Sequence, residues 1–423
     1  MTRNFVIIGY HLISTQDKLR FGCDAFTRRG YAARAVSCWH IFGKGHVSDL
    51  ERGQFVMAPD VAIPETWNGL LQILDSLSPA DFILVTAPFT KETSPLFLAL
   101  SERNLRYSSI TLGKLPITFN CLLGDFKDIA TCLRMKIREF LEFLRRARFR
   151  FRQMMAIGTN YLKVKPPLFC IRGGTYSLHF VEYIPKLWRA EIIDVASFDL
   201  AATRLPAPVL DDLPDHPYAV YLDVSLRDHP DWLVDGGTPD DLDETFADLR
   251  RTFDKLEKDL GLSVVIALHP KTSYTAEEID TLFGGRQVFR NATRSLVRNA
   301  NLVLGHASTA YSFAVIHRKP VLFLTNTTLS TSPDGIFIEI IASWLGHRPL
   351  DMSRLAIDSP RIELPAVNER HYARYFEKFL CAKGGHADFI WDHVIDRFET
   401  RIGTTPPVEF DDTPSLQSLG GKR

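Results

Sequence analysis

The sequence lacks long hydrophobic runs and any excess of charge. Its longest apolar stretches, such as Phe82–Pro88 and Val264–Leu268, fall far short of the roughly 20 residues that a membrane-spanning helix needs. The N-terminus carries no signal-peptide pattern. Because 50 Lys and Arg residues balance 50 Asp and Glu residues, a dedicated nucleic-acid binder is not indicated. We therefore expect a cytoplasmic protein.

Cysteine is scarce and scattered. The 423 residues include 6 cysteines, with no Cys-x-x-Cys pair and no histidine partners at metal-ligand spacing. This pattern favours neither a disulfide framework nor a zinc site. We expect reduced, buried thiols and no metal site.

The overall amino-acid composition is that of a globular protein. Hydrophobic residues make up 45% of the chain and charged residues 24%, which is close to the average for soluble domains. At about 150 residues per domain, the length predicts two or three domains.

The second half of the chain shows a regular alternation of strands and helices. Strands are predicted over Ala219–Asp223, Ser263–Leu268, Gln287–Phe289, Leu302–Leu304 and Val321–Leu324. Helices are predicted over Pro239–Leu260, from Thr275 to Gly284, over Arg294–Ala300 and over Thr309–His317. Thr275 and Glu278 form a capping-box pattern. Strict alternation of this kind predicts a doubly wound parallel sheet.

The first half gives a weaker but similar signal. Phe5–Tyr10 predicts a strand, and Gln16–Arg29 a helix after it, which is the usual entry to an α/β domain. Further strands are predicted at Phe82–Thr86 and at Leu168–Ile171, and the latter is followed by Gly173 and Gly174, a turn that permits close backbone approach. We divide the chain into an α/β domain over residues 1–203, a second α/β domain over 204–365, C-terminal helices over 366–403 and a disordered tail over 404–423.

The stretch Phe126–Lys165 has a composition of its own. It is rich in Arg and Lys, and Phe140, Phe143, Phe149, Phe151 and three methionines lie between them. A basic helix with aromatic side chains can lie on an anionic membrane surface. The alternative is a long surface helix whose aromatic residues face the core and whose arginines are solvated.

Polar residues follow three of the predicted strands in the second half. Asp223 ends the first strand, His269-Pro270-Lys271-Thr272-Ser273 follows the second, and Gly305-His306-Ala307-Ser308-Thr309 opens a helix. Ligands of open α/β sheets bind at the carboxyl ends of the strands. A helix N-terminus offers free N–H groups to a phosphate, whose charge His269 or Lys271 would neutralise.

Each of these residues also has a purely structural interpretation. Ser308 or Thr309 can serve only as a helix cap, His306 can be a buried histidine with satisfied hydrogen bonds, and Pro270 can simply end a strand. Their occurrence together at neighbouring strand ends is what favours a nucleotide-phosphate pocket.

The spacing of these motifs resembles a known enzyme class. His269-Pro270, then Ser308-Thr309 about forty residues later, then Lys319-Pro320 before a final strand, resembles the donor-binding half of GT-B glycosyltransferases that build bacterial capsule and lipopolysaccharide. Bacterial sialyltransferases and polyglycerolphosphate transferases share this arrangement. Tyr218–Asp231 also resembles surface-carbohydrate biosynthesis proteins. The resemblance covers about Tyr218–Thr325, a quarter of the chain.

The resemblance implies a fold, a donor and an acceptor. The fold would be GT-B-like, with two Rossmann-like domains facing a cleft. The phosphates of a nucleotide-sugar donor would lie near His269, Pro270, Lys271, Ser273, His306, Ser308 and Thr309. The donor is a substrate, so no cofactor is implied, and a glycan or glycolipid acceptor would enter from the N-terminal domain. A peripheral position on the inner face of the cytoplasmic membrane, through 126–165, would bring the enzyme to such acceptors.

Two features remain open at the level of sequence. No Asp-x-Asp stands in a loop at a strand end, so transfer is expected to be metal-independent, and Asp240-Asp241-Leu242-Asp243 is better explained as the acidic first turn of a helix. The acidic motif of the sialyltransferases is absent from the N-terminal half. Candidate bases for the acceptor hydroxyl are His11, Asp17 and Asp223.

The leading hypothesis is a glycosyltransferase of bacterial surface polysaccharide. One alternative is transfer of an alditol phosphate from a CDP carrier, which uses the same His-Pro and Ser-Thr motifs. A nucleotide-sugar 2-epimerase would need carboxylates on both sides of the sugar, for which the sequence offers no convincing set. A non-catalytic, membrane-associated scaffold of polysaccharide assembly is the third alternative.

Overall fold

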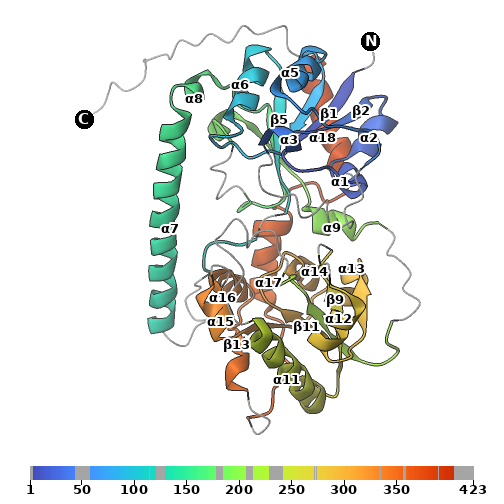
Figure 1. Cartoon of the computed structure of the whole chain (residues 1–423), viewed down its shortest axis with the longest axis vertical. Coiled ribbons are helices and arrows are strands. Elements are labelled where there is room, and N and C mark those ends of the chain that lie inside the picture. The colour runs from blue at the N-terminus through green and yellow to red at the C-terminus, as the bar shows by residue number, and fades with distance from the viewer. Residues whose placement is uncertain are drawn as a thin grey trace.

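The protein is built on two parallel β-sheets (Figure 1). The computed structural model describes residues 3–42, 58–113, 115–120, 129–177, 184–205, 213–227, 242–270, 272, 274–332, 335–355, 359–388 and 390–403. The predicted tail over 404–423 lies outside these residues.

The first sheet has the strand order β3-β2-β1-β4-β5-β6-β7. Its strands are β1 (Asn4–Gly9), β2 (Ala32–Ser37), β3 (Val61–Ala62), β4 (Phe82–Val85), β5 (Tyr107–Thr111), β6 (Phe169–Arg172) and β7 (Glu191–Asp194). Its connecting helices are α1 (Thr15–Arg20), α2 (Cys23–Arg28), α3 (Trp39–Phe42), α5 (Trp67–Asp75) and α6 (Ser94–Glu102), followed by α7 (Ile129–Ile157), α8 (Asn160–Lys163), η1 (Leu187–Arg189) and α9 (Phe198–Ala202). The chain first builds outward from β1 to β3 and then returns to β4 beside β1, so the direction of winding switches between β1 and β4.

The second sheet has the order β10-β9-β8-β11-β12-β13. Its strands are β8 (Tyr218–Leu222), β9 (Ser263–Leu268), β10 (Val288–Arg290), β11 (Leu302–Gly305), β12 (Val321–Thr325) and β13 (Leu350–Asp351). Its helices are α11 (Leu242–Leu260), α12 (Ala276–Phe283), α13 (Thr293–Asn299), α14 (Tyr311–Ile316), α15 (Thr327–Thr331) and α16 (Gly335–Trp344), with the 3₁₀ turn η2 (Met352–Arg354). Here the winding switches between β8 and β11. The α/β class and the GT-B-like arrangement of two doubly wound domains are therefore confirmed.

Alternation along β1 shows why these residues form a central strand. Phe5 and Ile7 belong to the core cluster on one face of the first sheet, and Val6 and Ile8 belong to the cluster on the other face. All four side chains are fully buried, as expected of a parallel strand that is covered by helices on both faces.

The predicted helix over Gln16–Arg29 is two helices instead. Gly22 separates α1 from α2 and takes a left-handed φ of 83°, and a Cβ at this position would lie 2.3 Å from the Trp391 ring. The break exists because an aromatic ring from the far end of the chain packs against it.

The predicted C-terminal helices over 366–403 are interrupted by a loop. Helix α17 (Glu369–Tyr375) continues into the π-helix η3 (Phe376–Leu380), and α18 (Ile390–Gly403) begins only after a loop. Trp391 and Phe398 of α18 pack in the core of the first sheet, with Phe398 4.7 Å from Phe82 between ring centroids. The chain thus returns from the second domain to the first (Figure 1).

The structure also tests several smaller predictions. The capping box of Thr275 and Glu278 is present at α12, and Gly174 approaches the backbone so closely that a Cβ would lie 2.3 Å from Lys378 O. Cys23, Cys38, Cys170 and Cys381 are buried free thiols. Helix α14 begins at Tyr311 and not at Thr309, and the predicted start of the helix at Pro239 lies outside the described residues.

Helix α7 runs along the side of both domains (Figure 1). The alternative interpretation, in which its aromatic residues face the core, is wrong, because Phe140, Phe143, Phe149 and Phe151 are 58%, 57%, 47% and 67% exposed. None of the described helices is both long and apolar enough to span a membrane.

Candidate active site at the carboxyl edge of the second sheet

The topology brings the three predicted polar segments together. β9, β8 and β11 are neighbours and run parallel, so the residues that follow them share one edge of the sheet. The switch in winding between β8 and β11 opens the crevice in which doubly wound sheets bind ligands. Asp223, His269 and His306 come directly after these three strands.

Asp223 holds the loop that follows β9. Its Oδ2 accepts hydrogen bonds from His269 N at 3.1 Å and Thr272 Oγ1 at 2.9 Å, and its Oδ1 accepts one from Ser225 N at 3.0 Å. Burial raises the pKa of this carboxyl above its ordinary value. Both oxygens are therefore occupied in a site that is almost closed to solvent, which suits a positioning residue better than a base.

His269 and Pro270 stand at the open side of this loop. His269 is half-buried and Pro270 is exposed, and the turn is closed by a hydrogen bond from Thr272 N to His269 O at 3.0 Å. Lys271 and Ser273 lie outside the described residues. The backbone of His269 is thus fixed by Asp223 while its ring lies at the sheet edge.

His306 is a buried histidine. Its side chain is 2% exposed, and Nδ1 lies 2.7 Å from Leu324 O. A carbonyl can only accept, so Nδ1 carries the proton and Nε2 is a buried acceptor with no hydrogen-bond partner among the described atoms. Burial lowers the pKa of His306 to about 4, so the ring is neutral near pH 7 and brings no positive charge to a phosphate.

Ser308 and Thr309 lie in the turn before α14. Ser308 Oγ accepts a hydrogen bond from Ala310 N at 3.2 Å, while Thr309 is exposed. Ala310 is the N-cap residue and has no side-chain cap. The interpretation of Ser308 or Thr309 as the cap residue of this helix is therefore wrong. Ser308 instead closes a turn that faces the same edge as His269.

Three further polar residues at this switch point escaped the sequence analysis. The hydroxyls of Tyr221, Ser225 and Tyr311 are buried and have no hydrogen-bond partner among the described atoms. Tyr221 packs edge-on against His306, with ring centroids 5.8 Å apart, and a Cβ on Gly305 would lie 3.2 Å from Tyr311 Oη. Buried polar atoms without partners are unusual, and no sequence pattern marks a tyrosine within a strand as one of them.

The candidate bases of the first domain follow β1. His11 is exposed and packs edge-on against Tyr10, with ring centroids 4.6 Å apart. Asp17 closes the capping box of α1, because its Oδ2 accepts from Ser14 N at 3.0 Å and from Ser14 Oγ at 2.7 Å. Of these two, His11 is the more open to solvent.

The carboxyl edges of the two sheets meet through α9 and α14. Helix α9 follows β7, helix α14 follows β11, and both lie between the sheets (Figure 1). Asp199 of α9, Ser312 of α14 and Tyr375 of α17 lie close together at this contact. Burial raises the pKa of Asp199 to about 6. The predicted sites of the first and second domains are therefore on facing edges.

No family model matches the sequence, and no curated protein matches it. Among solved structures, the fold is similar to S. aureus MnaA in a co-structure with UDP (11% identity, 97% of this chain and 100% of that chain, TM-score 0.46). It is also similar to the wall teichoic acid polymerase TagF (11%, 95% and 89%, 0.49) and to MurG of Acinetobacter baumannii (9%, 94% and 99%, 0.43). With TM-scores below 0.5, these similarities leave the chemistry to be inferred from this chain's own residues.

Two shallow cavities lie away from this edge. One, of about 560 Å³, is lined by Gly346, His347 and residues 365–370. The other, of about 240 Å³, lies between the domains beside α7 and is lined by Asn120, Lys136, Glu139, Tyr176, Trp344 and Arg374, together with Thr118 and Phe119. None of the predicted site residues lines either of these two cavities.

Proposed function

We propose that this protein is a glycosyltransferase that binds a nucleotide-activated sugar at the carboxyl edge of its second sheet. The observation that carries the proposal is the convergence of the His269 loop and the Ser308 turn beside the β8/β11 switch point. A nucleotide bound there would lie opposite the first domain, across the contact between α9 and α14.

Each residue has a distinct part in the proposed reaction. His269, with the hydroxyls of Ser308 and Thr309, would donate hydrogen bonds to the phosphates as negative charge develops on the leaving nucleotide. Lys271 and Ser273 would add a charge and a hydroxyl on the same loop. Asp223 would act on His269 indirectly, by fixing its backbone.

The base is proposed to come from the first domain. Asp223 is enclosed by three hydrogen-bond donors and Asp17 by a capping box, whereas His11 is exposed at the end of β1. Histidine is the side chain that most often abstracts a proton as a general base. His11 is therefore the candidate we prefer.

We propose an acceptor of the bacterial surface-polysaccharide class, a capsule or lipopolysaccharide glycan or glycolipid. The enzyme would meet it at the inner face of the cytoplasmic membrane, with the donor as a substrate and no resident cofactor. Because no Asp-x-Asp stands at a strand end, transfer is proposed to be metal-independent.

Nucleotide binding to the purified protein tests the donor site. A ligand that binds only the folded protein at about 100 times its Kd adds about 2.7 kcal/mol to the free energy of unfolding. Among CMP, CDP, UDP and GDP, we expect one to raise the melting temperature of the wild type and to lose this effect in His269→Ala.

The matched control is His216→Ala. His216 lies at the opposite, amino edge of the same sheet, where Nε2 is 2.7 Å from Ser263 Oγ, so this variant should keep the full shift. An equal shift in His269→Ala, or no shift with any nucleotide, would contradict the proposed donor site.

Product analysis then separates the possible reactions. Phosphate in the product indicates alditol-phosphate transfer, and a changed sugar nucleotide without acceptor indicates an epimerase.

A further inference from the structure

The outer face of α7 is a continuous apolar stripe. Side chains spaced three, four or seven residues apart along the helix are exposed, at 60% for Leu133, 52% for Ile137, 58% for Phe140, 43% for Leu144, 67% for Phe151 and 68% for Met155. At 100° per residue these positions share one side of the helix. The stripe is about 33 Å long at a rise of about 1.5 Å per residue.

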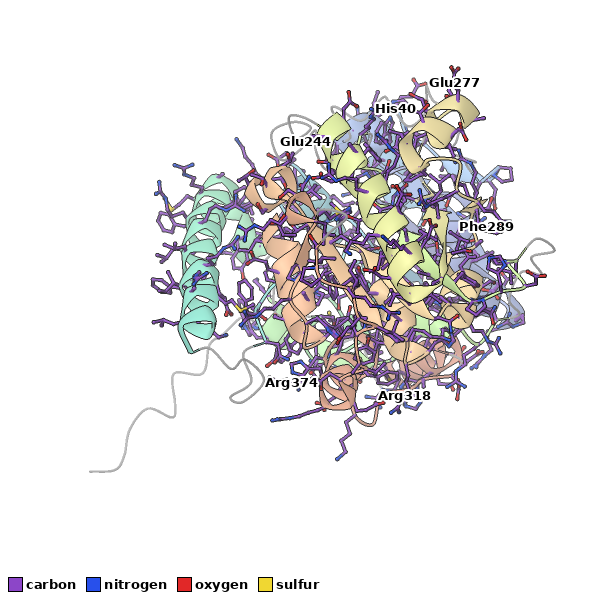
Figure 2. All side chains as sticks on the ribbon, turned by 90° about the horizontal axis from the view of Figure 1, so that it is seen from below. His40, Glu244, Glu277, Phe289, Arg318 and Arg374 are labelled. Atoms are coloured by element: carbon purple, nitrogen blue, oxygen red, sulfur yellow. The ribbon has the colours of Figure 1, made fainter. Side chains whose placement is uncertain are left out.

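The inner face of the same helix is attached to both domains. Met135 is 9% and Ile157 6% exposed. Arg138 pairs with Glu339 of the second domain, and Gln153 Oε1 accepts a hydrogen bond from Lys91 N of the first domain at 3.0 Å. The helix is therefore held in place, and its outer stripe is directed away from the protein. Figure 2 shows the side chains on this side projecting away from the rest of the molecule.

Charge distinguishes this surface from the rest of the chain. Ile129–Ile157 contains 8 Lys and Arg residues against 2 Glu residues, although the whole chain has no net charge. Arg134, Arg145, Arg148 and Arg152 are exposed and lie along one flank of the apolar stripe by the same helical spacing. Apolar side chains flanked by arginines are the pattern of a helix that lies in the interface of an anionic membrane.

We infer that the outer face of α7 binds the surface of an anionic bilayer, with the stripe in the acyl boundary and the flanking arginines at the headgroups. A second copy of the chain is the competing occupant. Pairing two such helices would bring two strongly basic surfaces together, which repel, whereas lipid phosphates neutralise them. The helix is too polar to span a bilayer, so it lies parallel to the surface.

Vesicle co-sedimentation of the full chain tests this inference. We expect binding to vesicles of phosphatidylcholine with phosphatidylglycerol, and little binding to phosphatidylcholine alone. In the double variant Phe140→Asp with Phe151→Asp, binding should fall by at least about tenfold, because both side chains lose their contact with lipid. Arg148→Glu with Arg152→Glu should also weaken binding to the anionic vesicles.

The matched control places the same two charges elsewhere. Leu19 and Leu364 are 54% and 49% exposed and lie outside α7, so Leu19→Asp with Leu364→Asp should bind like the wild type. All variants change exposed side chains, and unchanged melting temperatures would show that they fold.

Absence of binding to anionic vesicles, equal binding to neutral ones, or full binding by Phe140→Asp with Phe151→Asp would overturn the inference. If the wild type forms a dimer and does not bind vesicles, and if Phe140→Asp with Phe151→Asp dissociates that dimer, the stripe would instead bind a second copy of the chain. The readout needs no nucleotide, so it is independent of the proposed donor site.

Discussion

The Leu324 carbonyl determines which ring nitrogen of His306 carries the proton. Leu324 O fixes it on Nδ1, and the enclosing core disfavours a second proton, so that the pKa falls from 6.5 to about 4. Below pH 6.5 the unfolded chain takes up a proton at this position while the folded protein does not. The contribution of His306 to stability is therefore full above about pH 6.5 and is lost as the pH falls toward 4.

Replacing His306 by Gln tests the direction of this pH dependence of stability. The neutral amide keeps a hydrogen-bond donor for Leu324 O but cannot titrate, so the loss of stability between pH 6.5 and 4 should be smaller in His306→Gln than in the wild type. Urea unfolding at several pH values measures it. Asp199, whose pKa is raised to about 6, changes stability in the opposite direction in both proteins and cancels in the comparison. Parallel pH profiles for the two proteins would show that His306 is not buried neutral.

Residue types at the strand ends could be predicted, but their contacts could not. Asp223 and His269 were placed together because the carboxyl ends of parallel strands share an edge. That the Asp223 carboxylate binds the His269 backbone, and not a substrate hydroxyl, depends on how the loop folds back at Thr272. Tyr221 and Tyr311 gave no signal, because an aromatic residue at a buried position is ordinary in any core.

At the scale of elements, Gly22 and Gly30 form a natural pair for an experiment. Both have a left-handed backbone, with φ of 83° and 84°. A Cβ at Gly22 would lie 2.3 Å from the Trp391 ring, whereas a Cβ at Gly30 would meet nothing within 4 Å. The two sites share the backbone strain of a non-glycine residue and differ in the space around it.

We expect both alanine variants to lose about 1–2 kcal/mol from the left-handed backbone. Gly22→Ala should lose more, because Trp391 must move away from α1 and give up its hydrogen bond from Nε1 to Arg20 O at 2.9 Å. Chemical denaturation measures both losses, and quenching of the tryptophan signal reports Trp391. Equal losses in the two variants would show that the ring adapts freely.

Elements of the second domain could be predicted because each depends on a local pattern. Unbroken apolar runs mark the buried strands, and the capping box marks the start of α12. The break at Gly22 and the packing of α18 could not be predicted, since both depend on contact between residues far apart in the sequence. The aromatic residues of α7 were open to two interpretations, because the amphipathic pattern alone does not say which medium covers the apolar face.

At the scale of the whole molecule, Ser312 connects the two domains. Ser312 is 5% exposed and lies close to both Asp199 of α9 and Tyr375 of α17. In Ser312→Ala the buried Asp199 and Tyr375 lose a polar neighbour, at a cost of about 1–3 kcal/mol. We expect a lower free energy of unfolding and a larger radius of gyration by small-angle X-ray scattering.

Ser332→Ala is the control for this variant. Ser332 Oγ donates to Leu329 O at 2.7 Å within the second domain, so its loss should leave the radius of gyration unchanged. If Ser312→Ala also leaves it unchanged, contacts other than this hydroxyl hold the domains in place, such as the bond from Arg294 to Ala202 O.

The return of α18 to the first sheet has a consequence for biosynthesis. Phe5, Phe26 and Phe82 are translated early, yet the core that they form is completed by Trp391 and Phe398. Strands β8 to β13 and their helices are all synthesised before α18 leaves the ribosome. At about 5–20 residues per second, the first domain must wait many seconds with an unfinished core while the second domain, although later in the sequence, can fold ahead of it. A nascent chain halted before α18 would therefore carry a folded second domain and an incomplete first domain, a state in which chaperones would recognise the N-terminal half.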